Sequence, residues 1–156
     1  MRGTNYRKKT NESVSLPAAA SHLCLDDITL VFAFSNLSAE AIQKMNPVEL
    51  GSGGLCFLVA EILADRFPDS VLCRLTCQDR KRYAHVFVSV KSVPVDIKGF
   101  RNVDKMRFDY DDTSLVLEPI DEASVRQFFY PHYAERQLLN ARIALESYIK
   151  SHPDVF

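Results

Sequence analysis

The sequence predicts an α+β fold in which helices from both ends of the chain pack against a mostly antiparallel β-sheet. Apolar residues recur at helical spacing over residues 55–67 and again over 134–150. Between these helices, residues 71–97 form short apolar runs separated by charged turns, a pattern typical of strands. The 156 residues suit one domain with one hydrophobic core.

The start of the chain differs in composition from the remainder. Residues 1–21 are rich in Ser, Thr, Asn, Arg and Lys, so we expect a flexible tail followed by a single domain over residues 22–156. No apolar segment typical of a cleaved signal peptide follows the basic N-terminus. We therefore expect a cytoplasmic protein, or one exported by a specialised system for which the tail would be the address.

Charge and hydropathy exclude two classes of partner. No apolar run in the chain approaches the roughly 20 residues that span a bilayer. The formal net charge of -1 gives no preference for nucleic acid or for an anionic membrane. We expect neither as a partner.

Local signals place the other elements. Ser38 is the expected N-cap of a short helix over residues 39–45, which Asn46-Pro47 ends. The mixed spacing of apolar residues over 23–37 predicts a helix, or a helix and a turn, in that segment. We expect an irregular loop over residues 104–112. The remaining predicted elements are strands over 71–77, 83–90, 93–97 and 115–117, a turn at Lys91-Ser92, and helices over 121–129 and 134–150.

Cys56 is the candidate nucleophile because of its place on a helix. The run Gly51–Gly54 holds three of the five glycines and leads directly into the predicted helix over 55–67. In the first helical turn, unpaired N–H groups and the positive end of the helix dipole favour a thiolate. The backbone at Gly54 and the N–H of Cys56 are the expected support for an oxyanion on an attacked carbonyl. A cysteine taken alone is more often a small buried hydrophobe.

His85 and Asp96 are the expected base and its orienting acid. His85 opens a strand of alternating valines, and Asp96 lies on the next strand. If Lys91-Ser92 is a two-residue hairpin turn, Phe87 faces Asp96, and His85 becomes the diagonal neighbour of Asp96 on the same face. A carboxylate at that place holds the imidazole tautomer that a general base needs. A change of one residue in the turn would move Asp96 to the opposite face.

Three segments together resemble the papain-like and transglutaminase-like cysteine hydrolases, and in particular compact bacterial-type members. They are GSGGLCFLVAEIL with Cys56, HVFVSV from His85 and PVDIKGF with Asp96, and they span residues 51–100. The resemblance implies a papain-like or transglutaminase-like core with its nucleophile helix on the sheet, and a Cys-His-Asp triad. It also implies a monomer acting on a protein or peptide substrate. Papain-like members often place a Gln before the Cys as a second oxyanion donor, whereas Leu50 stands near that place here.

The expected activity is thiol-dependent hydrolysis of an amide, as in a protease, without a cofactor or a metal. Glutamine deamidation and transglutamination begin with the same step, so an effector that modifies a host protein is an open alternative. A non-catalytic protein-binding module on the same fold is another. A zinc site formed by Cys73 and Cys77 with Cys56 and His85 is also conceivable, although a strand would hold its two sulfurs too far apart for one metal.

Overall fold

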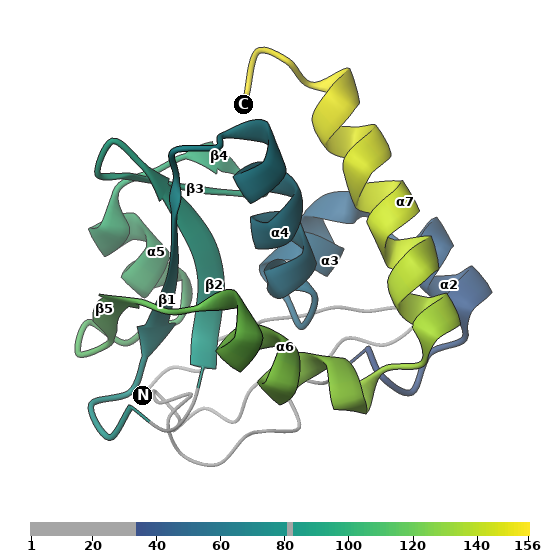
Figure 1. The fold of residues 1–156 in the computed structure, drawn as a ribbon, viewed down its shortest axis with the longest axis horizontal. Coiled ribbons are helices and arrows are strands. Elements are labelled where there is room, and N and C mark those ends of the chain that lie inside the picture. The colour runs from purple at the N-terminus through teal and green to yellow at the C-terminus, as the bar shows by residue number, and fades with distance from the viewer. Residues whose placement is uncertain (1–33, 81–82) are drawn as a thin grey trace.

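The computed structural model describes residues 34–80 and 83–156, and it confirms the α+β class. A five-stranded sheet has α4 and α7 on one side and the short helix α5 on the other (Figure 1). The tail expected over residues 1–21 lies outside the described residues, and so does most of the segment 23–37.

The sheet follows the order β4-β3-β2-β1-β5, and every neighbouring pair of strands is antiparallel. Its strands are β1 (Val71–Thr76), β2 (Tyr83–Val90), β3 (Val93–Asp96), β4 (Gly99–Phe100) and β5 (Val116–Pro119). The strands predicted over 71–77, 83–90 and 93–97 are confirmed, and the one predicted over 115–117 begins one residue later. Strand β4 was not expected, because two residues are too few to show a periodic pattern.

The helices bracket the sheet in sequence. They are α2 (Ala39–Lys44), α3 (Pro47–Ser52), α4 (Cys56–Arg66), α5 (Val103–Asp109), α6 (Glu122–Phe129) and α7 (Glu135–Ser151), with a 3₁₀ turn η1 (Tyr130–His132). The helices predicted over 39–45, 55–67, 121–129 and 134–150 are confirmed, with ends that differ by one residue.

Asn46 and Pro47 were expected only to end a helix, but they also begin the next one. Asn46 Oδ1 accepts the N–H of Val48 at 2.8 Å, and Pro47 takes the first position of α3, where no helical hydrogen bond is lost. Gly51 and Ser52 are the last two residues of helix α3, so the glycine-rich turn before α4 contains only Gly53 and Gly54 of the glycine run.

Gly51 lets α3 approach the segments that hold the candidate site. A Cβ at this position would lie 2.8 Å from Ile97 Cβ and 2.8 Å from Val59 Cγ2. Distances that short do not occur between real side chains, so a larger residue would push α3 away from α4 and from the turn after β3.

The larger hydrophobic core lies between the sheet, α4 and α7. Residues of α4 such as Leu58 and Leu63 pack in one cluster with Val86 and Val88 of β2 and Leu145 of α7. Burial of this apolar area, at roughly 25 cal/mol per Å², supplies the main stabilisation. It also fixes the start of α4 against β2.

Helix α5 corrects the expectation of an irregular loop over residues 104–112. Asn102 Oδ1 accepts a backbone N–H of the first turn at 2.7 Å and so caps the helix. Met106 and Tyr110 then pack with Phe87 in a second cluster on the other face of the sheet. The charged residues between them hid this spacing in the sequence.

A buried carboxylate joins α4 to the C-terminal helices. Glu61, 8% exposed, accepts hydrogen bonds from Arg142 at 2.5 Å and from the Tyr130 hydroxyl at 2.8 Å. Arg126 of α6 lies 3.4 Å from the same oxygen. Such a cluster orients α6 and α7 relative to α4, because each partner left alone would carry an unpaired polar group.

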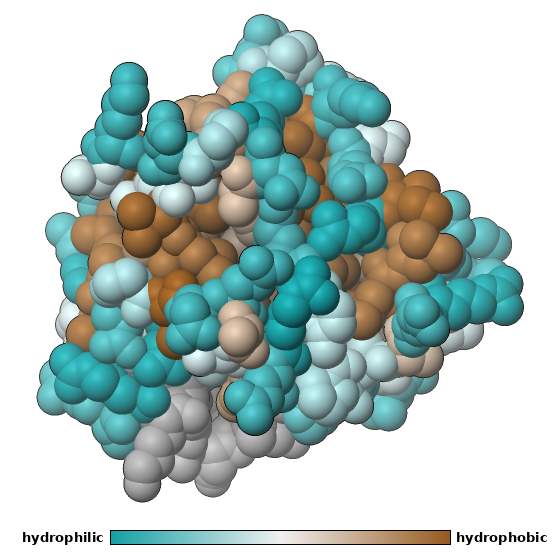
Figure 2. Space-filling model, viewed as in Figure 1, coloured by the Kyte–Doolittle hydropathy of each residue, from teal (hydrophilic) through white to brown (hydrophobic). Residues whose placement is uncertain are grey.

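Apolar side chains also reach the surface. On the face in Figure 2 they form several areas separated by polar side chains. The exposed large apolar residues of the described segments are Val71, Val93, Phe100, Phe108, Leu117, Leu139 and Ile143. Within residues 34–80 and 83–156, no helix is long and apolar enough to cross a membrane.

Candidate active site

Cys56 is the first residue of α4 and is almost fully buried. It follows the turn Gly53-Gly54-Leu55, in which Leu55 is the N-cap, and it is 4% exposed. Its thiol is free. The small side chain belongs to the core cluster between α4 and the sheet, so both the chemical and the packing interpretations of a cysteine apply to it.

The hairpin that joins β2 to β3 has the register predicted from a two-residue turn. Lys91 and Ser92 have positive φ angles of 52° and 70°, as a type I′ turn requires, and Val90 pairs with Val93. The pair Val88–Val95 follows, which places Phe87 opposite Asp96. Asp96 therefore shares a face with His85.

His85 and Asp96 are in direct contact. The Nε2–H of His85 donates to Asp96 Oδ2 at 3.0 Å, and both side chains are 4% exposed. This bond holds the imidazole with its proton on Nε2. Its Nδ1 is buried and has no conventional hydrogen-bond partner in the described residues.

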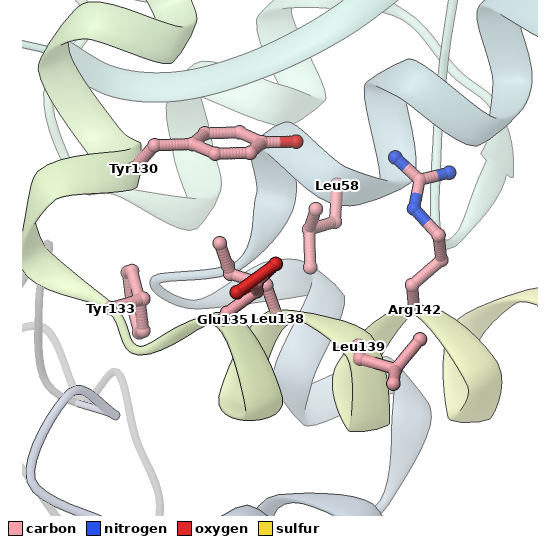
Figure 3. A pocket seen from close by; sticks show the side chains of 7 residues that line it. All are labelled: Leu58, Tyr130, Tyr133, Glu135, Leu138, Leu139 and Arg142. Atoms are coloured by element: carbon pink, nitrogen blue, oxygen red, sulfur yellow. The ribbon is translucent and has the colours of Figure 1, made fainter.

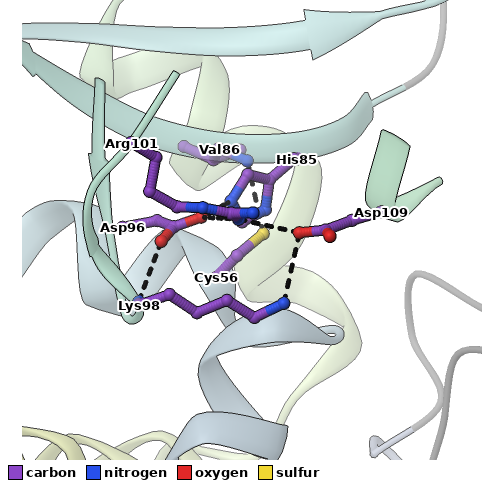
Figure 4. A network of polar contacts seen from close by, with 7 residues as sticks. All are labelled: Cys56, His85, Val86, Asp96, Lys98, Arg101 and Asp109. Carbon is purple, nitrogen blue, oxygen red and sulfur yellow. Dashed lines mark hydrogen bonds and ion pairs between the residues drawn. The ribbon is translucent and has the colours of Figure 1, made fainter. Parts of the chain in front are cut away.

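Cys56 reaches His85 around the edge of β2. Strand β3 ends at Asp96, so the N–H of Val86 has no strand partner on that side. The Sγ of Cys56 accepts this N–H at 3.4 Å (Figure 4). The helix start thus takes the place that another residue of β3 would occupy. It brings the Cys56 thiol into hydrogen-bonding and coulombic interaction with His85, which in turn is bonded to Asp96.

Electrostatics favour a protonated His85. Burial by itself lowers the pKa of the imidazole, but the hydrogen bond to Asp96 and the proximity of Cys56 outweigh it and raise the pKa from 6.5 to about 9. At neutral pH the site therefore holds an imidazolium beside the sulfur, a condition that favours the thiolate form of a cysteine.

Asp96 is held by more donors than the sequence indicated. The N–H of Lys98 donates to Oδ1 at 2.8 Å, and Arg101 Nη1 donates to Oδ2 at 3.2 Å. Burial opposes ionisation, but His85, Arg101 and the Lys98 N–H together lower the pKa of Asp96. The carboxylate is charged, and both of its oxygens accept hydrogen bonds from neighbouring groups.

Arg101 and Asp109 were not expected at the site. Arg101 Nη1 also donates to Asp109 Oδ2 at 2.7 Å, and Lys98 Nζ lies 3.2 Å from the same oxygen (Figure 4). In the sequence, Asp109 fell within the irregular loop expected over residues 104–112. The cap at Asn102 was the signal that could have placed Asp109 on a helix facing the hairpin.

The expected oxyanion support differs in detail from the prediction. The N–H of Cys56 donates to the carbonyl of Gly53 at 3.3 Å, so it is already engaged. The carbonyl of Gly54 accepts the hydroxyl of Tyr133 at 3.3 Å, which anchors the turn to the segment before α7. An oxyanion at this place would have to displace the long bond to Gly53.

The structure gives no support to the zinc alternative. No group of three or more His, Cys, Asp or Glu side chains suited to a metal is found among the described residues. Cys73 belongs to the cluster on the α5 face, whereas Cys56 belongs to the α4 face. Cys73 is a free thiol whose pKa is raised by burial, and Cys77 is disulfide-bonded.

A cavity of about 430 Å³ lies away from these residues, between α4, η1 and α7 (Figure 3). It is lined by Leu58, Tyr130, Tyr133, Glu135, Leu138, Leu139 and Arg142. None of Cys56, His85 and Asp96 takes part in its lining, so this cavity is separate from the candidate active site. His132 lies in η1 but is not among the residues that line this cavity.

Comparison of the chain with protein-family models finds no match, and neither curated proteins nor solved structures include a significant match. The family resemblance of residues 51–100 therefore remains a prediction, and any function is argued from the geometry of the site.

Proposed function

We propose that the protein is a thiol-dependent hydrolase that acts on an amide of a protein or peptide through Cys56, His85 and Asp96. One observation supports this most strongly. A free cysteine at a helix start interacts with a buried histidine that is bonded to a buried aspartate, and the bond to Asp96 engages Nε2, which leaves Nδ1 as the ring nitrogen available to the thiol. Histidine and aspartate in that arrangement serve to activate a nucleophile.

The proposed reaction has two halves. The Cys56 thiolate attacks the carbonyl carbon, and the His85 imidazolium gives its proton to the departing amine, leaving a thioester on the sulfur. His85, now neutral, takes a proton from water, which attacks the thioester and releases the acid and the thiolate. Asp96 holds the imidazole in place and stabilises its charged form in both halves.

The protein itself contains a matched control for a test of the thiolate. Cys56 and Cys73 are both free and each is 4% exposed, and tryptic cleavage at Arg66 and Arg74 places them on different peptides. Alkylation by iodoacetamide is followed by mass spectrometry at each cysteine from pH 5 to 10. We expect the Cys56 rate to depend less steeply on pH than the Cys73 rate, which rises about tenfold per pH unit toward the usual thiol pKa, about 8.5, or above.

The shape of the profile is used rather than the absolute rate, because burial slows both thiols. In His85→Gln, the Cys56 profile should take the shape of the Cys73 profile. If Cys56 follows Cys73 in the unmodified protein and His85→Gln changes nothing, the thiol site is inert and the proposal is wrong.

The reaction class requires a separate experiment. Incubation of a protein mixture with the protein or with Cys56→Ser, together with a primary-amine probe, distinguishes three outcomes by mass spectrometry. New peptide N-termini indicate proteolysis, conversion of Gln to Glu indicates deamidation, and incorporation of the probe indicates transglutamination. We expect new N-termini that Cys56→Ser does not produce.

A non-catalytic protein-binding module is the second candidate. Two observations favour it: Cys56 is 4% exposed, and its N–H is already bonded to Gly53. On this alternative the three residues stabilise the join between α4 and the hairpin. A Cys56 profile with the shape of the Cys73 profile would favour it.

A further inference from the structure

Asp96 Oδ2 is shared between two cations. His85 Nε2 lies 3.0 Å from it and Arg101 Nη1 lies 3.2 Å from it. When one carboxylate oxygen accepts from two cations, the two cations lie close together and repel each other. The net stabilisation of each charged donor is therefore smaller than it would be if that donor were alone. Arg101 therefore limits how strongly Asp96 stabilises a protonated His85.

The fold places Arg101 for this contact. The N–H of Arg101 donates to the carbonyl of Pro94 at 2.8 Å, and Val95 pairs with Phe100. Since paired residues of an antiparallel sheet share a face, Arg101 lies on the same face as Asp96, and Phe100 on the other. Its side chain is 13% exposed, so solvent screens the contact only in part.

Asp109 tunes Arg101 in turn. It lies 2.7 Å from Arg101 Nη1 and 3.2 Å from Lys98 Nζ, so charges alternate along His85, Asp96, Arg101, Asp109 and Lys98 (Figure 4). The groups that face His85 itself are Asp96 from β3, Cys56 from α4 and the Tyr110 ring, 5.7 Å away, after α5.

We propose that Arg101 is a positioning residue of this site, which holds the Asp96 carboxylate toward His85 and moderates the charge that Asp96 presents to it. The inference rests on the proposed function, because it assigns Arg101 to the activation of Cys56. The test distinguishes the role of Arg101 from the hydrolase activity, because the protonation of His85 can be observed directly without measuring any reaction.

The test uses two variants with opposite expected signs. Arg101→Met removes the competing cation, so the imidazolium of His85 should persist to higher pH, by about one pH unit for a cation bonded to the same carboxylate oxygen in a partly screened site. Asp109→Asn leaves more of the Arg101 charge on Asp96, so the same titration should shift to lower pH. Arg101→Lys keeps the charge and should return most of the original profile.

The readout is the NMR titration of the His85 ring nitrogens in the full chain, with His85→Gln used to assign its signals among the four histidines. The pH dependence of the Cys56 alkylation rate should shift in the same direction as the His85 titration. A purely structural role predicts loss of stability without a shift in either titration. If the two variants leave the His85 titration in place, or move it in the same direction, the inference is overturned. Where Arg101→Met is too unstable to measure, an Asp109→Asn titration that does not shift to lower pH overturns it. If the NMR shifts occur while Cys56 stays inert, the inference holds and the proposed hydrolase activity fails.

Discussion

The hydrogen bond from His85 Nε2 to Asp96 Oδ2, 3.0 Å long, joins two strands of one hairpin at a place where both side chains are only 4% exposed. It depends on a turn several residues away. The same turn that sets the register of β2 and β3 therefore sets the charge state of the candidate base.

Stability should fall as the pH rises above neutrality. The pKa of His85 is raised to about 9, so its protonated form stabilises the fold fully below the ordinary pKa of 6.5, and that contribution is lost as the pH rises through about 9. The loss amounts to at most about 3–4 kcal/mol, since one pKa unit corresponds to about 1.4 kcal/mol. Urea unfolding at pH 6, 7.5 and 9.5 measures it. In His85→Gln this dependence should be absent, and an equal slope in both proteins would contradict the expectation.

Acid should act on Asp96 in the opposite sense. Its pKa is lowered from the ordinary 3.8, so its contribution is present above that value and is lost only as the pH falls through the lowered pKa. Asp96→Asn keeps an acceptor for one donor but removes the charge shared by His85 and Arg101. We expect a loss of about 3–5 kcal/mol at pH 7, as for other broken buried ion pairs, together with a lower His85 pKa measured by NMR. A variant as stable as the parent protein would show that the pair is not coupled to folding.

The hairpin turn offers a test of the register. Lys91 and Ser92 both have positive φ, which costs energy for residues other than Gly, Asn and Asp. Replacement by Asn-Gly should stabilise the protein by about 1 kcal/mol, measured by urea unfolding, and should leave the alkylation profile of Cys56 unchanged.

A one-residue insertion in the same turn is the matched disruption. Insertion of Gly between Lys91 and Ser92 would move Asp96 to the other face of the sheet. The His85 pKa should then fall toward or below its ordinary value, and Cys56 should alkylate with the profile of an unpaired thiol. Retention of the original His85 titration in this variant would mean that the register does not control the site.

A variant at Glu61 should change the stability of the fold without changing the chemistry of the candidate active site. The Glu61 carboxylate is 8% exposed and binds Arg142 and Tyr130, yet it takes no part in the contacts of His85. Glu61→Gln should lower the free energy of unfolding by about 1–3 kcal/mol through the weakened charge-assisted bonds. The pH profile of Cys56 alkylation should not move. A shift in that profile would show that the C-terminal helices influence the start of α4.

Some features were predictable because they depend on neighbours in the chain. Helix α4 and strands β1 to β3 follow from local periodicity, and the contact between His85 and Asp96 follows from the length of one turn. Helices α3 and α5 were missed. Pro47 signals a helix end as well as a helix start, and the charges between Met106 and Tyr110 masked their common face.

By itself, the sequence determined the α+β class, the placement of Cys56 at a helix start and the pairing of His85 with Asp96, because each rests on interactions within about a dozen residues. Only the tertiary structure decided that Cys56 interacts with His85 beside the part of β2 that β3 does not cover, that Arg101 shares Asp96 with His85, and that all three candidate residues are buried. These relations join elements whose packing depends on the whole core, and no local pattern records which strand edge a helix start will cover.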